Sequence, residues 1–153
     1  LALAADSKPS NPLKIVRNTN KRFVFTATHF ELDQAFQPQA GQVFEAWYRQ
    51  QARHVFGKRC DQMARLLGLK YYRLRLSSAR TRWGACSRQG TISLVWRLIM
   101  APDRVIDYVI LHELIHLRTH NHSKAFWAQV EAAMPDYQKQ VKWLKEHGHE
   151  LKI

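Results

Sequence analysis

The pentapeptide His112-Glu113-Leu114-Ile115-His116 constrains this chain more than any other feature of its 153 residues. It lies in a stretch that opens at Pro102-Asp103, and its apolar spacing predicts a helix running to about His120. Residues four apart share a helical face, so both imidazoles can bind one metal ion. Glu113 is close enough to that face to take a proton from a water molecule on the ion. The motif therefore predicts a catalytic zinc site on a helix.

Such a site needs a third protein ligand, and three residues are candidates. His122 is preferred, because Asn121 can end the helix in a left-handed conformation and let the chain fold back toward the motif. His120 would lie about 12 Å along the helix axis from the first motif histidine, and three ligands in a line cannot form a tetrahedral corner. Glu131, on the next expected helix, is the other alternative. We expect one Zn²⁺ per chain, held by the two motif histidines and His122.

The rest of the pattern is a mixture of strands and helices, which predicts an α+β fold. Residues 1–13 are small, polar and punctuated by proline, so we expect a disordered lead-in to a single domain over 14–153. The elements expected are strands at 14–17, 22–30, 71–76 and 91–96, a long helix at 39–69, a connection at 80–90, a helix capped by Ser123 that ends at Ala133, and a last helix from Pro135 to Gly148.

The chain is strongly basic, with 24 Lys and Arg against 12 Asp and Glu and a net charge of +12. This balance favours polyanionic partners such as nucleic acid or nucleotides. No apolar run approaches the roughly 20 residues of a membrane-spanning helix, and the opening residues 1–5 lack the basic region of a signal peptide. Cys60 and Cys86 are too few for a disulfide framework. We therefore expect a cytoplasmic protein with reduced thiols and no membrane partner.

Several further segments occur in order around the motif. They are Arg82-Trp83-Gly84-Ala85-Cys86-Ser87, Trp96-Arg97-Leu98-Ile99, Ala101-Pro102, 105–109, Asn121-His122-Ser123, Phe126-Trp127 and Trp143-Leu144-Lys145. Together with the motif, this set resembles the YgjP-like metal-dependent hydrolases, which are close to the SprT-like zinc metallopeptidases. The strong match covers about residues 80–148. The chain departs from the usual pattern at Ala85, where the family has Ser, and at Val95, where it has Asn.

The resemblance implies a zincin-like fold. In such a fold a small antiparallel or mixed sheet packs on the motif helix, with a long helix in the N-terminal half and two C-terminal helices. The resemblance also implies that His112, His116 and His122 are the metal ligands and that Glu113 is the catalytic acid/base.

We expect a zinc-dependent metallopeptidase that cleaves peptide bonds, with an extended substrate pairing with the strand expected at 91–96. Arg82, Trp83 and Trp96 are candidates for substrate binding, because arginine clamps carboxylates or phosphates and indole rings stack on flat groups. Two alternatives stay open. One is a nucleotide phosphohydrolase that uses the same site, and the other is a nucleic-acid-associated module in which zinc is only structural. A peptidase recruited to nucleic acid through its basic surface would combine them.

Overall fold

The computed structural model describes residues 13–17, 23–26 and 28–151. The expected lead-in, residues 1–13, lies outside this part of the chain except for Leu13, which begins the first strand. The described residues up to Tyr48 form one compact unit, and those from Arg49 onward form a second. Small sheets and helices occur in both, so the α+β prediction is confirmed. That the whole of 14–153 acts as a single domain stays a prediction.

The first unit is built on a three-stranded sheet. Its strands are β1 (Leu13–Val16), β2 (Phe23–Phe25) and β3 (Phe30–Asp33), in the order β1-β3-β2, with β1 parallel and β2 antiparallel to β3. The single strand expected at 22–30 is wrong, because the chain turns where the Thr26 N–H donates to the His29 carbonyl at 2.8 Å. A cluster of aromatic rings packs in this unit, formed by Phe23, Phe25, Phe30, Phe44 and Trp47.

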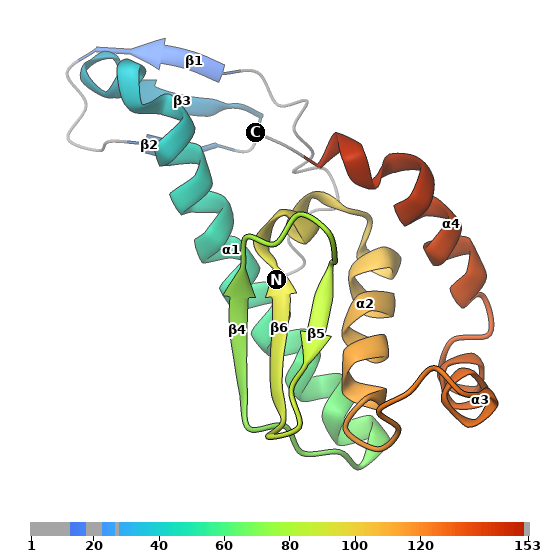
Figure 1. The fold of residues 1–153 in the computed structure, drawn as a ribbon. Helices are drawn as coiled ribbons and strands as arrows, with labels where there is room; N and C mark the ends of the chain where they lie inside the picture. The colour runs from blue at the N-terminus through green and yellow to red at the C-terminus, as the bar shows by residue number, and fades with distance from the viewer. Residues whose placement is uncertain (1–12, 18–22, 27, 152–153) are drawn as a thin grey trace. The chain divides into compact units, whose positions relative to one another are not determined.

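The long expected helix is present as α1 (Ala40–Leu67), which follows a 3-10 turn, η1 (Gln34–Gln39) (Figure 1). In the second unit its buried residues recur every four positions, at Ala52, Phe56, Cys60 and Ala64. This spacing places them on one face of the helix. Gly68, with a φ of 64°, ends it in the left-handed conformation that glycine adopts most easily.

The second unit holds a mixed three-stranded sheet in front of α1 (Figure 1). Its strands are β4 (Arg73–Ser77), β5 (Gly84–Cys86) and β6 (Thr91–Val95), in the order β4-β6-β5. Strand β6 runs parallel to β4 and antiparallel to β5. Strand β5 lies inside the expected connection and was not predicted. Because β6 has a partner on both sides, the expectation that it pairs with a substrate is wrong, and the edge strand beside the motif helix is β5.

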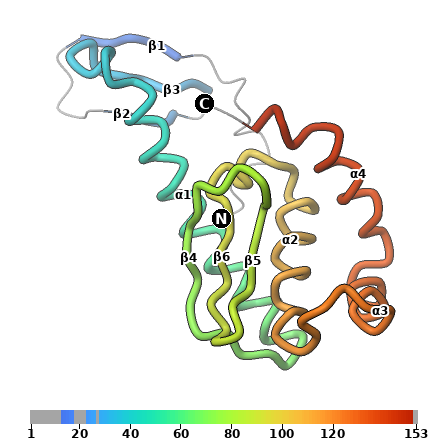
Figure 2. The backbone as a smooth tube through the Cα atoms, viewed as in Figure 1, coloured from blue at the N-terminus to red at the C-terminus, as the bar shows by residue number. Residues whose placement is uncertain are grey.

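The motif helix is α2 (Asp103–Ile115), which follows η2 (Trp96–Met100) and contacts β5 and β6 on one side and two C-terminal helices on the other (Figures 1 and 2). Those helices are α3 (Lys124–Ala133) and α4 (Tyr137–His147), and the short turn η3 (Gly148–Glu150) follows. The core lies between the sheet and α2, where Ile92 and Leu94 of β6 are fully buried. Helix α2 ends at Ile115 rather than near His120 as expected. No helix within the described ranges has the length and apolar character that crossing a membrane requires.

Candidate active site

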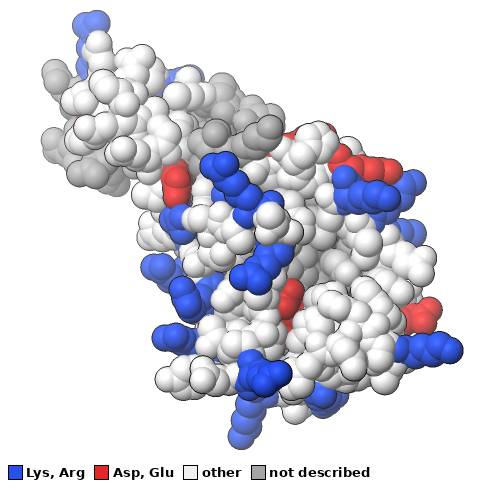
Figure 3. Space-filling model, viewed as in Figure 1, with Lys and Arg blue, Asp and Glu red and all other residues white. Residues whose placement is uncertain are grey.

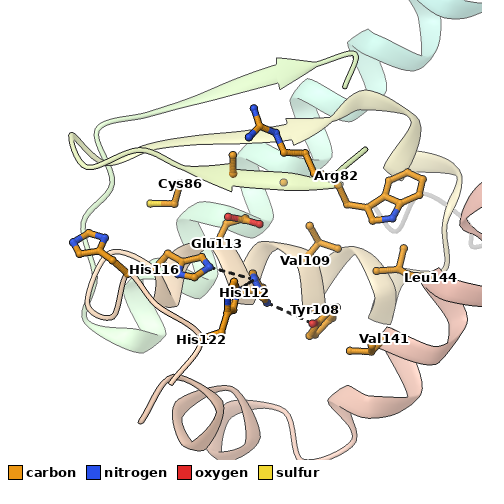
Figure 4. Close-up of a pocket in the computed structure, with 14 residues that line it drawn as sticks. Arg82, Cys86, Tyr108, Val109, His112, Glu113, His116, His122, Val141 and Leu144 are labelled. Atoms are coloured by element: carbon orange, nitrogen blue, oxygen red, sulfur yellow. Dashed lines mark hydrogen bonds between the residues drawn. The ribbon is translucent and has the colours of Figure 1, made fainter. Parts of the chain in front are cut away.

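Three imidazoles meet at the C-terminal end of α2 (Figure 4). Nε2 of His112 lies 3.3 Å from Nε2 of His116 and 2.9 Å from Nε2 of His122. The ligand atoms of all three lie within 4.8 Å of one another. Three ligand nitrogens this close together form a cluster that a single ion can bridge.

The turn after α2 orients the second histidine of the motif. His116 is the C-cap residue, and its Nδ1 lies 3.0 Å from the carbonyl oxygen of Thr119. When Nδ1–H donates to that carbonyl, the lone pair stays on Nε2, the atom that faces the cluster. The Nδ1 of His112 lies 3.4 Å from the Tyr108 hydroxyl, one helical turn earlier. The backbone and a neighbouring side chain therefore set the ring directions.

The third imidazole reaches the cluster from the segment between α2 and α3. Ser123 begins α3 as expected, with its hydroxyl accepting from the Phe126 N–H at 3.4 Å, and His122 lies immediately before it. Phe126 is fully buried and its ring lies 4.6–4.9 Å from all three imidazole rings, measured between centroids. The Trp127 ring stacks on that of His122 at 5.8 Å. Two aromatic side chains of α3 thus support the cluster.

The surroundings keep the α2 imidazoles neutral. Burial, reinforced by the neighbouring His116 and His122, lowers the pKa of His112 to about 4. Burial also lowers the pKa of His116, although its hydrogen bond to Thr119 opposes this. A neutral imidazole offers a lone pair to a metal without first losing a proton. The electrostatics therefore favour metal binding over protonation.

The donor set fits a zinc ion. Zinc–imidazole bonds of 2.0–2.1 Å in a tetrahedron place the ligand nitrogens about 3.3–3.4 Å apart. The His112–His116 separation matches this, whereas the His112–His122 separation of 2.9 Å is shorter. Three protein ligands leave one position open, as catalytic zinc sites do. His120 and Glu131, the two alternative third ligands, are both exposed and stand outside the group of three. The expected distance of His120 along the helix axis, which counted against it as a ligand, is wrong, because α2 ends at Ile115, before that residue. The three histidines that lie together are nevertheless the expected ones.

Glu113 lies beside the cluster and is buried, with 6% of its surface exposed. Burial raises its pKa to about 7, an effect that the nearby Arg82 guanidinium partly offsets. Its carboxyl group packs against Gly84 of β5. A Cβ on that residue would lie 2.6 Å from both Cγ and Oε1 of Glu113. The absence of a side chain at position 84 therefore leaves the space in which the Glu113 carboxylate sits.

The cluster and Glu113 line a cavity of about 500 Å³ (Figure 4). Its walls come from β5, the segment before it, α2, α4 and the turn that carries His120. Arg82 and Trp83, two of the predicted substrate-binding residues, lie on its wall. The structure does not bring Trp96 there. That side chain is 3% exposed and packs in the core, with the guanidinium groups of Arg49 and Arg97 over its ring.

Other residues of the cavity were not singled out from the sequence. An apolar part of the wall is formed by Val109 of α2 and by Val141 and Leu144 of α4. Nothing in their local pattern separates them from core residues, because they reach the site through the packing of α4 beside α2. Gly84 did carry a signal, as a glycine inside the Arg82–Ser87 segment, and its close approach to Glu113 explains the requirement.

Comparisons with known proteins bear on the fold and the family of the chain. No curated protein sequence matches the chain significantly. Among solved structures, the crystal structure of the metallopeptidase zymogen of Pyrococcus abyssi abylysin is similar, with a TM-score of 0.54 and 21% identity. The likeness covers 60% of this chain and 93% of that one, and it shows a shared fold. The family model for the YgjP-like metallopeptidase domain matches residues 9–147. The chain therefore belongs to the YgjP-like family of metallopeptidase domains.

Proposed function

We propose that this protein is a zinc-dependent peptidase in which His112, His116 and His122 hold the metal and Glu113 is the general base. The convergence of three imidazoles beside a buried carboxylate is the observation that carries the proposal. If a divalent ion were held by these three imidazoles, it would polarise a carbonyl oxygen and lower the pKa of a bound water molecule toward neutrality. An open fourth position argues against a purely structural role, because structural zinc sites have four protein ligands.

Glu113 is placed to move the proton in this reaction. A carboxylate oxygen accepts the proton of the attacking water and then delivers it to the nitrogen of the departing amine. Burial suits both steps, because a carboxyl group with a pKa near 7 can accept and release a proton at neutral pH. Contact with Gly84 holds the carboxylate in one place, and Arg82 is near enough to interact with its charge.

The edge strand β5 is where we propose that the substrate lies. Its residues Gly84, Ala85 and Cys86 line the cavity, and among the strands of the described residues none pairs with its outer edge. An extended peptide can add to such an edge through main-chain hydrogen bonds. That position would bring its carbonyl groups past Glu113. The apolar wall formed by Val109, Val141 and Leu144 would then receive an apolar side chain.

A direct test is hydrolysis of a quenched fluorescent peptide library by protein whose metal content has been measured. The expected result is close to one zinc per chain and cleavage that a chelator stops and added zinc restores. Glu113→Gln should keep the metal and the melting temperature while the rate falls by 10²–10⁴, the usual contribution of a general base. Full activity of the metal-loaded variant would refute the role of Glu113. Hydrolysis of nucleoside triphosphates but of no peptide would favour the phosphohydrolase alternative.

A further inference from the structure

A second cavity, of about 310 Å³, lies beside the first. It is lined by parts of β4 and β6, by β5, and by the segment between β4 and β5. Three residues, Arg82, Gly84 and Ala85, line both cavities. The two spaces therefore meet at β5, the strand along which the proposed function places the substrate.

Strand register shows on which face of the sheet the second cavity opens. Gly84 pairs with Leu94 and faces Glu113 of α2, so that face is the one covered by α2. Ala85 pairs with Ser93, and Ser93 pairs with Arg75, which places these three in one row across the sheet. Successive residues of a strand point to opposite faces. The row is therefore on the face away from α2.

Arg82 is part of the lining of this cavity together with Arg75 and Ser93, and it also lines the metal-site cavity. Across the described ranges, neither Arg75 nor Arg82 hydrogen-bonds or forms an ion pair with another residue. This distinguishes them from Arg59, whose guanidinium contacts Asp103 and Asp107 at 2.8 and 2.7 Å. Two guanidinium groups that have no hydrogen-bonded or ion-paired partner among the described residues thus line one cavity, although Arg82 also interacts with the charge of Glu113.

The other polar groups of the cavity are suited to an anion. Ser77 and Ser93 add hydroxyl groups, and no acidic residue is among those that line it. Figure 3 shows basic side chains over the region where the three strands lie in Figure 1, with little acidic surface among them. Guanidinium groups bind carboxylates through short charge-assisted hydrogen bonds. The cavity therefore matches a carboxylate in charge and in donors.

We propose that this cavity is a specificity pocket for a glutamate side chain of the substrate. The inference rests on the proposed function, since it takes the substrate to be a peptide added to the edge of β5. Alternate side chains of such a peptide point to opposite faces of the extended sheet. A residue opposite Gly84 or Cys86 points into the metal-site cavity. The substrate residue opposite Ala85 points to the face away from α2. There its side chain would extend along the row formed by Ala85, Ser93 and Arg75, near Arg82.

The size of Ala85 supports a long side chain at that position. A methyl group at position 85 is the only side chain of β5 between the peptide and Ser93. A substrate strand would lie about 14 Å from β4, which is three strand spacings, so an extended substrate side chain and an extended Arg75 side chain must together span this distance. A glutamate carboxylate extends further across Ala85 than an aspartate does. We therefore expect Glu to be preferred over Asp at this position, and both over Gln and Asn.

The test compares peptides that are identical except for Glu, Asp, Gln or Lys at each position around the cleaved bond. For the zinc-loaded protein, kcat/KM should favour Glu over Gln by about tenfold or more at one position, the scale of a hydrogen bond to a charged group. Arg75→Gln should reduce that ratio to near one, chiefly by lowering kcat/KM for the Glu peptide. Arg75→Glu should shift the preference toward Lys. A Glu preference unchanged in Arg75→Gln would overturn the proposal.

Arg73→Gln is the matched control. Arg73 lies two residues earlier on the same strand and face, is equally charged, and is outside the cavity, with its guanidinium over the Tyr72 ring. The Arg73→Gln variant should keep the preference for the Glu peptide. If it lost this preference as fully as Arg75→Gln, the general positive charge of the surface, and not the pocket, would be the cause of the preference. Melting temperatures of both variants should match the parent, because both side chains are exposed.

Binding of the same peptides to the zinc-loaded Glu113→Gln protein separates this inference from the proposed function. Cleavage of peptides with no Glu preference would overturn the pocket and leave the peptidase standing. If no peptide is cleaved, the proposed function fails, and calorimetry on the inactive protein then decides about the pocket. Tighter binding of the Glu peptide that Arg75→Gln abolishes would support it. Equal binding, or competition by inorganic phosphate or nucleoside triphosphate alone, would overturn it.

Discussion

Gly84→Ala offers the sharpest test of how the site is assembled. The added methyl group would lie 2.6 Å from both Cγ and Oε1 of Glu113, whereas carbon atoms in ordinary contact are about 3.5–4.0 Å apart. Glu113 is buried, so little free space surrounds it. Either its carboxylate or strand β5 must therefore move by about 1 Å.

A displacement of this size predicts the magnitude of the effect. Misplacing a reacting group by 1 Å can cost about 10² in rate, and complete loss of general-base assistance costs up to 10⁴. We therefore expect kcat to fall by 10²–10⁴ in Gly84→Ala. Overpacking of a buried contact typically lowers the free energy of unfolding by about 1–3 kcal/mol. The three atoms nearest to the new methyl group all belong to Glu113, which is not a proposed metal ligand, so zinc content should stay at one per chain.

The assay combines steady-state hydrolysis, metal analysis and thermal unfolding of the same preparations. Gly57→Ala is the matched control, because a Cβ at that position of α1 meets nothing within 4 Å. It should retain full activity and gain up to about 1 kcal/mol of stability, since alanine suits a helix interior better than glycine. If Gly84→Ala were as active as Gly57→Ala, the tight packing of Glu113 against β5 would not matter for catalysis.

Further predictions concern the metal, stability and charge. His122→Ala should lose most of the bound zinc while His120→Ala keeps it, as metal analysis would show; the reverse result would contradict the three-histidine site. Arg59→Ala should lower the free energy of unfolding by about 1–2 kcal/mol, because it leaves the partly buried Asp107 without its partner. Arg104→Ala, which removes the exposed ion pair with Asp136, should lower the free energy of unfolding by less than about 1 kcal/mol. If the +12 charge recruits nucleic acid, affinity should not depend on base sequence and should fall with salt at a log–log slope of about −0.9 per neutralised phosphate. No binding at low salt would end that idea.

The sequence alone was enough to locate the candidate site. A spacing of four between His112 and His116 places two imidazoles on one helical face whatever the rest of the chain does. Ser123 begins α3 at the expected residue, because its hydroxyl satisfies a free N–H of the first turn. Because Ser123 is the N-cap of α3, His122 lies in the short segment between α2 and α3, close in sequence to the two motif histidines. These features are local in sequence, so local rules predict them.

Features that depend on distant partners were missed. Strand β5 has three residues and no alternation of its own, and it is a strand because β6 lies beside it. The buried stripe of α1 includes Ala52 and Ala64, whereas the apolar Leu66 is 87% exposed. Hydrophobic spacing identifies the helix but cannot show which of its faces meets the core.

Tertiary structure also decided the chemistry around the metal cluster. The contact between Gly84 and Glu113 joins residues 29 positions apart, and the row from Arg75 through Ser93 to Ala85 exists only because of the strand register. A one-residue slip of that register would send each of these side chains to the opposite face of the sheet. Residue types and short spacings are encoded locally, whereas close approaches and shared cavities arise only when distant segments pack against one another.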